Sequence, residues 1–380
     1  MTNLNSKVYI VLFLIVLLCL VFLYPFVKDR LDLSNYENRS LMTWNDVKVQ
    51  STWRDFFPNL QTMIDDNIFY KNESIKVIDC IDEYIFGDLF NSSVMIGKDN
   101  WLFYKGDGCI QDYRGGYEMP GEALERYADA AENLQSVLNE RGIELYLMIT
   151  PNKETIYGEQ YLPSKVKRIS DYSRADQIVE YLANNTECDV VYTKNSLLDA
   201  AGDQQIWKKY DTHWNKIGAF IACQDFLKTS KCDYVTLDQV RIATNGRLTG
   251  DLANMLGMTE RFFDDTDYII EGYLENIDIE ELETIVQPNL SYIVLASNAK
   301  YDQTVLFVGD SFLGYMKPYI GEIFSKCVFM HHDSYAILDE ERLMGIAPDV
   351  VVIQTAERFI SSYASWMNVY AENFKSNYNP

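Results

Sequence analysis

The segment Val305-Leu306-Phe307-Val308-Gly309-Asp310-Ser311 decides the fold of this 380-residue chain. A run of four apolar residues bounded by a turn signal is typical of a strand buried inside a parallel sheet. The Gly-Asp turn that follows places Ser311 at the carboxyl end of this strand, and open α/β folds bind their ligands at that edge of the sheet. The segment therefore predicts an α/β fold with a serine side chain at the ligand-binding edge.

Other segments predict the remaining strands and the helices between them. The apolar runs are Ile143–Ile149, Asp189–Tyr192, Val328–His331 and Val350–Ile353, with a hairpin at Val94–Tyr104. Helices are expected from Gly121 up to Gly142 and from Ser173 to Ala183, where apolar residues recur at helical spacing. A succession of strand, helix and strand indicates a parallel sheet with right-handed crossovers.

A second motif, Tyr210-Asp211-Thr212-His213-Trp214-Asn215, supplies an acid and an imidazole well before Ser311 in the chain. His213 is one of only three histidines, and it is expected to begin a helix. A serine hydroxyl is a weak nucleophile until an imidazole accepts its proton, and the imidazole needs a carboxylate that fixes its tautomer. Ser311, His213 and Asp211 are therefore predicted to form a catalytic triad for acyl transfer.

The adjacent pair His331 and His332, followed by Asp333, is the alternative source of a general base or of metal ligands. No Cys or carboxylate of metal-site spacing accompanies this pair, so it is interpreted as the end of a strand. The sequence thus predicts neither a metal nor a cofactor for the site.

The formal net charge of -23 limits the classes of partner. Binding to nucleic acid requires clustered Lys and Arg side chains that neutralise phosphates, and broad adsorption to anionic lipid requires a basic surface too. The composition is 48% hydrophobic, which is enough for a sizeable core. Nucleic acid is therefore excluded as a partner.

Residues 8–27 contain no charged side chain and are almost all apolar. As a helix, twenty residues at about 1.5 Å each span the roughly 30 Å hydrocarbon layer of a bilayer. A cleavable signal peptide would have a shorter apolar run and a small-x-small exit site, which this segment lacks. We therefore expect a transmembrane signal anchor at 8–27 after a short N-terminal tail at 1–7. Lys7 before it and Lys28 and Arg30 after it do not set its orientation.

The chain after the anchor is expected to have two parts. Residues 28–90 are rich in charge and aromatic rings, which predicts a stalk of short helices. Residues 91–380 hold the predicted sheet, with an inserted β-rich flap at about 259–300, where the sequence is acidic and weakly periodic. Cys223 and Cys232 are one possible disulfide pair, and most other cysteines are expected to be buried thiols.

The order of these strands resembles a circularly permuted SGNH (GDSL-type) hydrolase domain. Val305–Ser311 resembles the first strand and nucleophile turn of that fold, and Pro348–Ile353 resembles the strand that ends in its oxyanion-hole motif. Ile143–Thr150 resembles the next strand, although here it comes earlier in the chain, as does the acid–histidine motif. The resemblance implies a three-layer sandwich around a parallel sheet.

The Asp-x-His-Trp motif ahead of Gly-Asp-Ser, after a leading membrane anchor, resembles the alginate O-acetylation proteins of the AlgJ/AlgX type and their DHHW relatives. Further matches to the family pattern are Glu37–Leu41, Gly97–Tyr104, Pro151–Lys153 with Tyr157, Gly250–Leu252, and Pro348–Val351 with Glu357 and Arg358. Thr212 stands where the DHHW signature has a histidine, so the choice between the two branches stays open.

The family resemblance implies transfer of acetyl groups onto hydroxyls of a cell-surface or secreted polysaccharide. It also implies a multipass membrane-bound O-acyltransferase as the partner that supplies acetyl, and on this ground the catalytic domain is placed outside the cell membrane. Ser311 would carry the acetyl group, and its backbone N–H would stabilise the oxyanion. The second oxyanion donor is expected between Gln354 and Arg358, where the usual Asn is missing. Trp214 and Arg358 are expected to line an acceptor groove.

Two other functions stay open from the sequence. One is an acetyl-esterase that removes acetyl groups from the same glycans. The other is a catalytically idle glycan-binding or scaffold subunit that retains the fold. A binding module has no need of the complete set of Ser311, His213 and Asp211, so the enzyme is favoured.

Overall fold

The computed structural model describes Ile15 and residues 41–50, 55–67, 93–273, 279–287, 290–321, 323–332 and 338–375. The chain divides into two compact units. The first comprises Met1–Met95 with Thr249–Phe263, and the second comprises Ile96–Leu248 with Asp264–Pro380. All the predicted site residues belong to the second unit.

The first unit contains three described helices, α2 (Trp44–Gln50), α3 (Phe56–Asp66) and α11 (Asp251–Met255). The chain ahead of α2 is tied to the end of α3, because the backbone N–H of Met42 donates to Asp66 Oδ2 at 2.9 Å. Both α2 and α3 fall in the expected stalk at 28–90. The expected anchor at 8–27 lies outside the described residues apart from Ile15, and no described helix is long and apolar enough to span a bilayer.

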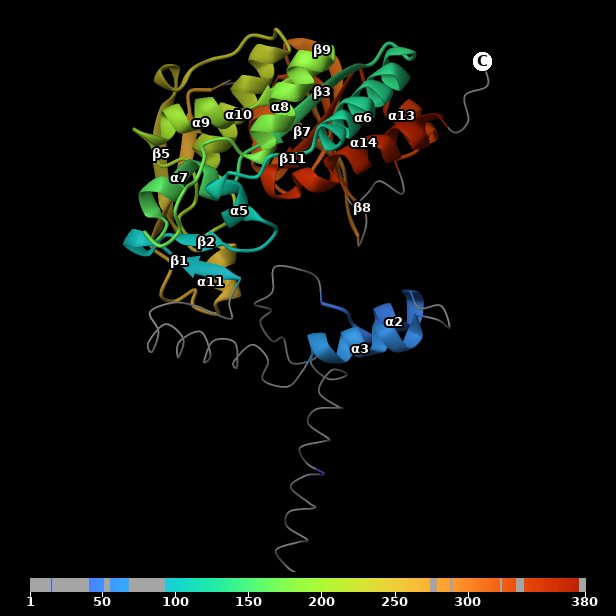
Figure 1. Ribbon diagram of the computed structural model, residues 1–380. Coiled ribbons are helices and arrows are strands. Elements are labelled where there is room, and N and C mark those ends of the chain that lie inside the picture. Colours follow the sequence, from blue (N-terminus) through green and yellow to red (C-terminus); the bar gives the residue numbers. More distant parts are fainter. Residues whose placement is uncertain are drawn as a thin grey trace, which may run out of the picture. The chain divides into compact units, whose positions relative to one another are not determined.

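A seven-stranded sheet forms the centre of the second unit (Figure 1). Its spatial order is β4 (Asp189–Tyr192), β3 (Glu144–Thr150), β11 (Val350–Ala356), β9 (Tyr301–Gly309), β10 (Phe324–His331), β8 (Leu290–Ser297) and β7 (Ile279–Gln287). The strands from β4 to β10 are parallel, as the sequence predicts, and β8 and β7 are antiparallel to their neighbours. The strand β3 therefore pairs with β11 although the two lie far apart in the chain.

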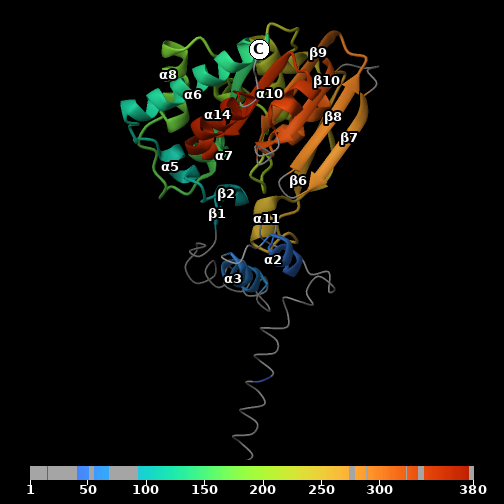
Figure 2. The same ribbon diagram turned by 90° about the vertical axis from the view of Figure 1, so that its right-hand side faces the viewer.

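The segment 259–300 does not form a separate flap. It has the expected β character in β6 (Asp265–Glu271), β7 and β8, but β8 hydrogen-bonds to β10 and so continues the central sheet. Figure 2 shows β7 and β8 side by side at this edge. The strand β6 pairs instead with β5 (Arg241–Leu248) in a small sheet of its own.

Helices cover both faces of the sheet and give three layers. One face packs against α6 (Gly121–Asn139), α8 (Arg174–Asn185), α13 (Glu340–Ile346) and α14 (Ile360–Lys375). The other face packs against α10 (Lys216–Thr229) and α12 (Leu313–Ile320), and α9 (Lys194–Ala201) lies against α10. Neighbouring residues of β3 point to opposite layers: Leu147 joins the α6 side, and the ring of Tyr146 meets Phe226 of α10 at 5.6 Å. Burial on both faces explains why these strands are apolar throughout.

Short elements complete the second unit. They are η2 (Lys98–Asn100), β2 (Leu102–Tyr104), α5 (Cys109–Arg114), α7 (Lys153–Tyr161), η3 (Leu237–Gln239) and η5 (Glu357–Phe359), and β1 (Val94–Ile96) spans the boundary between the two units. The predicted hairpin turn at residues 97–101 is present, with the N–H of Gly97 donating to the carbonyl of Trp101 at 2.7 Å.

Side-chain caps set where two helices begin. Ser173 caps α8 in a reciprocal capping box with Asp176, as the predicted start at Ser173 requires. The helix expected to begin at His213 begins at Lys216 instead, because Asn215 Oδ1 accepts from the N–H groups of Ile217 and Gly218. His213 therefore lies in the turn before α10.

The considered disulfide between Cys223 and Cys232 is not formed, because both thiols are free. Cys223 is buried in α10, and its thiol contacts the carbonyl of Met316 at 3.7 Å. Four of the five described cysteines are buried, which agrees with their interpretation as apolar core residues.

Candidate active site

The three predicted triad residues meet at the carboxyl edge of the sheet. His213 Nε2 lies 2.6 Å from Ser311 Oγ, and His213 Nδ1 lies 2.7 Å from Asp211 Oδ1. With its Nδ1 proton donated to the carboxylate, the imidazole presents the Nε2 lone pair to the serine hydroxyl. Asp211 is buried, whereas Ser311 is exposed and can meet a substrate.

The turn that carries Ser311 is fixed by Asp310 and Gln354. Asp310 is buried, and its two carboxylate oxygens accept from the N–H groups of Phe312 at 3.0 Å and Ala356 at 2.7 Å. The N–H of Asp310 itself donates to Gln354 Oε1 at 2.9 Å. A side chain at Gly309 would lie 2.3 Å from that same oxygen, so only glycine fits between β9 and β11 here.

Lys208 adds a cationic group beside Asp211 at the site. Its ammonium donates to Asp211 Oδ2 at 3.3 Å and to the hydroxyl of Tyr315. Burial alone would raise the pKa of Asp211, but the hydrogen bonds and charge of His213, with the charge of Lys208, hold this pKa below its ordinary value. The Asp211 carboxylate is therefore ionised and able to stabilise a protonated His213.

Trp214 is fully buried, so it does not line a surface groove as expected. Its indole N–H donates instead to the carbonyl of Phe312 at 3.2 Å, which joins the histidine loop to the nucleophile turn. Trp207 plays a parallel part, because its indole N–H donates to the carbonyl of Thr212 at 3.0 Å. The two tryptophans thus hold the residues beside His213 and Ser311.

A buried lysine supports the loop that ends in Asp211. Lys153 Nζ donates to three backbone carbonyls, those of Leu102 at 2.7 Å, Lys209 at 2.8 Å and Asp211 at 3.0 Å. On the next turn of α7, the hydroxyl of Tyr157 accepts from the N–H of Ile206 at 3.0 Å. These two side chains close the acid–histidine loop against α7.

Arg358 lies beside the nucleophile turn. Its guanidinium is 5.4 Å from the centre of the Phe312 ring, and its backbone N–H donates to Asn152 Oδ1 at 3.1 Å. Among the described residues none accepts from the backbone N–H of Ser311, which leaves this N–H available to an oxyanion. The N–H groups of Ala356 and Arg358 are already used, so the end of β11 supplies neither of them as the second donor.

The alternative bases lie one strand away from the nucleophile. His331 ends β10 opposite Gly309, and the ring of His332 packs edge-on against Trp366 at 4.2 Å. The imidazole that hydrogen-bonds to Ser311 is that of His213.

Several residues of the site belong to no motif that the sequence analysis identified. Lys208 and Tyr315 meet only in the folded chain, and Gln354 looks like one more residue of a buried strand. The one available signal was the Pro151–Lys153 segment with Tyr157, which the sequence analysis gave only as a match to the family pattern.

Comparison with known proteins finds a matching family model for part of this chain. Residues 94–272 match the family model described as SGNH hydrolase-like domain, acetyltransferase AlgX; this segment contains Asp211 and His213 but not Ser311. The probable alginate O-acetylase AlgJ of Pseudomonas aeruginosa is 28% identical over 131 residues, which is 34% of this chain and 31% of that relative.

The fold is shared with a solved structure of low sequence identity. Bacillus cereus PatB1 has a TM-score of 0.51 at 15% identity, with 71% of this chain and 97% of that chain covered. The O-acetyltransferase domain of Pseudomonas putida AlgJ has a TM-score of 0.47 at 18% identity, with 73% and 99% covered. Residues 94–272 are therefore similar to an SGNH hydrolase-like domain of the AlgX type, and the partly matching relative is a probable AlgJ.

Proposed function

We propose that this protein is a serine-dependent O-acetyltransferase that moves acetyl groups onto hydroxyls of a polysaccharide. The observation that carries the proposal is the continuous hydrogen-bonded line from Asp211 through His213 to Ser311, with the hydroxyl at the exposed end. The AlgX-type family match and the relative named a probable alginate O-acetylase support acetyl transfer in particular.

In the first half of the reaction, Ser311 Oγ attacks the carbonyl carbon of an acetyl ester while His213 Nε2 takes the hydroxyl proton. Negative charge develops on the carbonyl oxygen, where the backbone N–H of Ser311 can stabilise it. The ester bond to the leaving group breaks, and that group takes the proton back from His213. Acetyl is then bound to Ser311 as an ester.

In the second half, His213 removes the proton of a sugar hydroxyl, whose oxygen attacks the acetyl carbonyl. The bond to Ser311 Oγ breaks, and the serine recovers its proton from the imidazolium. Asp211 stabilises the charged imidazole in both halves. Transfer exceeds hydrolysis when the sugar is held close to the ester and water is displaced, since proximity is the main advantage of the bound hydroxyl.

The setting of the reaction is part of the proposal. Residues 8–27 form a charge-free apolar segment of bilayer length, which supports a membrane anchor with the catalytic domain outside. A multipass membrane-bound O-acyltransferase is the proposed donor, because acetyl has to reach this side of the membrane as an activated ester.

Replacement of Ser311 tests the chemistry. In the full chain, Ser311→Ala should lower p-nitrophenyl acetate turnover by about three orders of magnitude or more, because the nucleophile is gone. Ser362→Ala, a half-buried serine of α14 that belongs to no part of this site, is the matched control and should turn over normally.

A covalent readout separates the proposal from unspecific hydrolysis. After incubation with an activated acetyl ester, mass spectrometry should find one acetyl group on the peptide that contains Ser311, and none on that peptide in Ser311→Ala. Equal turnover by wild type and Ser311→Ala, or acetyl on another side chain only, would show that the triad is not the catalyst.

A further inference from the structure

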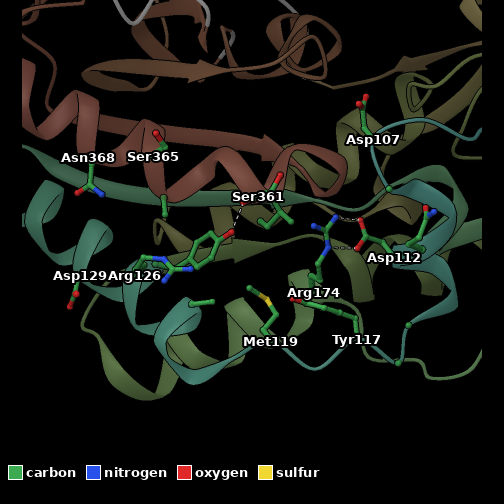
Figure 3. Close-up of a pocket in the computed structure, with 18 of the residues that line it drawn as sticks. Asp107, Asp112, Tyr117, Met119, Arg126, Asp129, Arg174, Ser361, Ser365 and Asn368 are labelled. Atoms are coloured by element: carbon green, nitrogen blue, oxygen red, sulfur yellow. Dashed lines mark hydrogen bonds and ion pairs between the residues drawn. The ribbon is translucent and has the colours of Figure 1, made fainter.

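A large groove lies in the second unit apart from the triad. It has a volume of about 1300 Å³, and its walls come from α5, α6 and α14 with Arg174 of α8 at one end (Figure 3). None of Asp211, His213 and Ser311 is among its lining residues. Single drug-sized ligands occupy sites of roughly 300–1,000 Å³, so this groove has room for an oligomer.

The α14 wall of the groove follows directly on the segment that contacts the nucleophile turn. Ile360 and Ser361 line the groove, and they follow η5 directly in the chain. Within η5, the guanidinium of Arg358 lies over the ring of Phe312, the residue after Ser311. A chain bound in the groove would therefore reach the Ser311 side of the sheet past Arg358.

The walls offer hydrogen-bonding groups that the protein does not use. Ser361, Ser365 and Asn368 follow one another along one face of α14, with Arg126 of α6 across from them (Figure 3). All four side chains are exposed, and no described residue hydrogen-bonds to them. Hydroxyl and amide groups both donate and accept, which is what a chain of sugar hydroxyls requires.

The groove also has an apolar surface on which sugar rings can pack. Tyr117 lies at the edge of the groove and is 59% exposed, and Met119 and Ala123 lie along the groove wall. An exposed aromatic ring gives a flat apolar surface beside a polar hydroxyl, and the C–H face of a sugar ring packs on such a surface.

The charges of the groove exclude a polyanion. The lining contains four carboxylates and three guanidinium groups. The charge of one guanidinium, that of Arg174, is already neutralised, because it makes two hydrogen bonds to Asp112, at 2.6 and 2.8 Å. Arg114 donates to the carbonyl of Lys167 at 3.3 Å. The whole chain carries -23, which repels an anionic polymer further.

We propose that this groove binds a segment of uncharged polysaccharide and holds the acceptor chain whose hydroxyl reaches Ser311. The proposal rests on the acetyltransferase function and names its acceptor class as a neutral glycan rather than a polyuronate. The polar row on α14 hydrogen-bonds to sugar hydroxyls, Tyr117 carries a ring, and Arg358 marks the exit toward the triad.

Calorimetric titration of the full-length Ser311→Ala protein, in a detergent without a sugar headgroup, tests the groove without turnover. The probes are cellohexaose, mannohexaose, xylohexaose and chitohexaose, with hexamannuronate as the anionic comparison. At least one neutral hexasaccharide should bind, and hexamannuronate should bind more weakly. The proposal is overturned if none of the four neutral probes binds, or if hexamannuronate binds more tightly than all of them.

Variants locate the site. Ser365→Ala combined with Asn368→Ala should weaken binding of the neutral hexasaccharide roughly tenfold, because two hydrogen bonds are lost. Ser365→Trp should fill the groove and abolish binding, whereas Ser362→Trp, on the same helix but outside the groove, should bind normally. Unchanged binding by the Ser365 variants would reject the groove. Because binding is measured without Ser311, its failure is separate from a failure of acyl transfer.

Discussion

At the scale of single residues, Trp214 helps to position the triad. It stands next to His213 in the chain, and its N–H reaches the carbonyl of Phe312, which stands next to Ser311. The base and the nucleophile are therefore joined twice, once by their own hydrogen bond and once through this buried contact. Small displacements of reacting groups have large effects on rate, so the second link matters for catalysis.

We expect Trp214→Phe to lower kcat for p-nitrophenyl acetate by roughly tenfold or more, because Ser311 and His213 lose a shared support. The carbonyl of Phe312 would lose its buried donor, which should lower the free energy of unfolding by about 1–3 kcal/mol. Steady-state kinetics and urea unfolding measure the two effects.

Trp366→Phe serves as the comparison, because Trp366 packs against His332 away from the triad and should leave kcat unchanged. A Trp214→Phe protein that loses stability but retains its kcat would show that Trp214 only fills the core.

Single residues also show which parts of the site could be predicted from the sequence and which could not. Ser311, His213 and Asp211 could be predicted because each has a distinct chemical role and lies at the end of an element. The expectation that Trp214 lines a groove is wrong, because its N–H finds a buried acceptor, and a sequence does not tell whether an indole N–H will do so. Lys208 carries no motif, and only the fold brings it to Asp211.

At the scale of elements, α7 holds the acid–histidine loop in place. Lys153 at its first turn reaches carbonyls of β2 and of the loop before α10, so one side chain joins three segments. Its ammonium also lies 5.1 Å from the ring of Trp101. A buried polar group of this kind is stable only while all its partners are satisfied.

Replacing Lys153 with Met keeps the length of the side chain and removes the donors. Three buried carbonyls would then lose a charged hydrogen-bond donor, and the free energy of unfolding should fall by about 3 kcal/mol or more. Urea unfolding followed by tryptophan fluorescence measures this change. Lys167→Met, an exposed lysine of the same unit, should change it little, and equal midpoints for the two variants would contradict the role of α7.

The elements themselves were predictable where burial is two-sided or where a cap is present. The strands β3, β4, β9 and β11 are short apolar runs because both faces are covered, and Ser173 marks the start of α8. The start of α10 was misplaced because Asp211 and Asn215 are both plausible caps, and only Asn215 accepts from the first turn. The pairing of β8 with β10 was missed because β8, although apolar, follows the acidic edge strand β7, so the segment as a whole shows only weak periodicity.

At the scale of the whole molecule, charge and the apolar N-terminal segment constrain where the protein works. A net charge of -23 gives no attraction to anionic lipid, so binding to a membrane has to come from hydrophobic burial. The charge-free segment 8–27 would supply that burial if it forms the proposed anchor. The basic residues on its two sides do not decide which end faces the cytoplasm, so orientation needs a direct measurement.

A cysteine placed on each side of the segment provides this measurement. In spheroplasts of a bacterial host, Ser164→Cys in an exposed turn should react with a membrane-impermeant maleimide above the wild-type level, because the proposed orientation places the catalytic domain outside. Asn5→Cys in the N-terminal tail should react only after lysis, since the tail would be cytoplasmic. Both chains should stay in the membrane pellet after alkaline carbonate washing, as expected for a spanning helix held by about twenty apolar residues. Labelling of Asn5→Cys before lysis would reverse the orientation, and release by carbonate would reject the anchor, in which case acetyl transfer would have to work without a membrane-tethered domain.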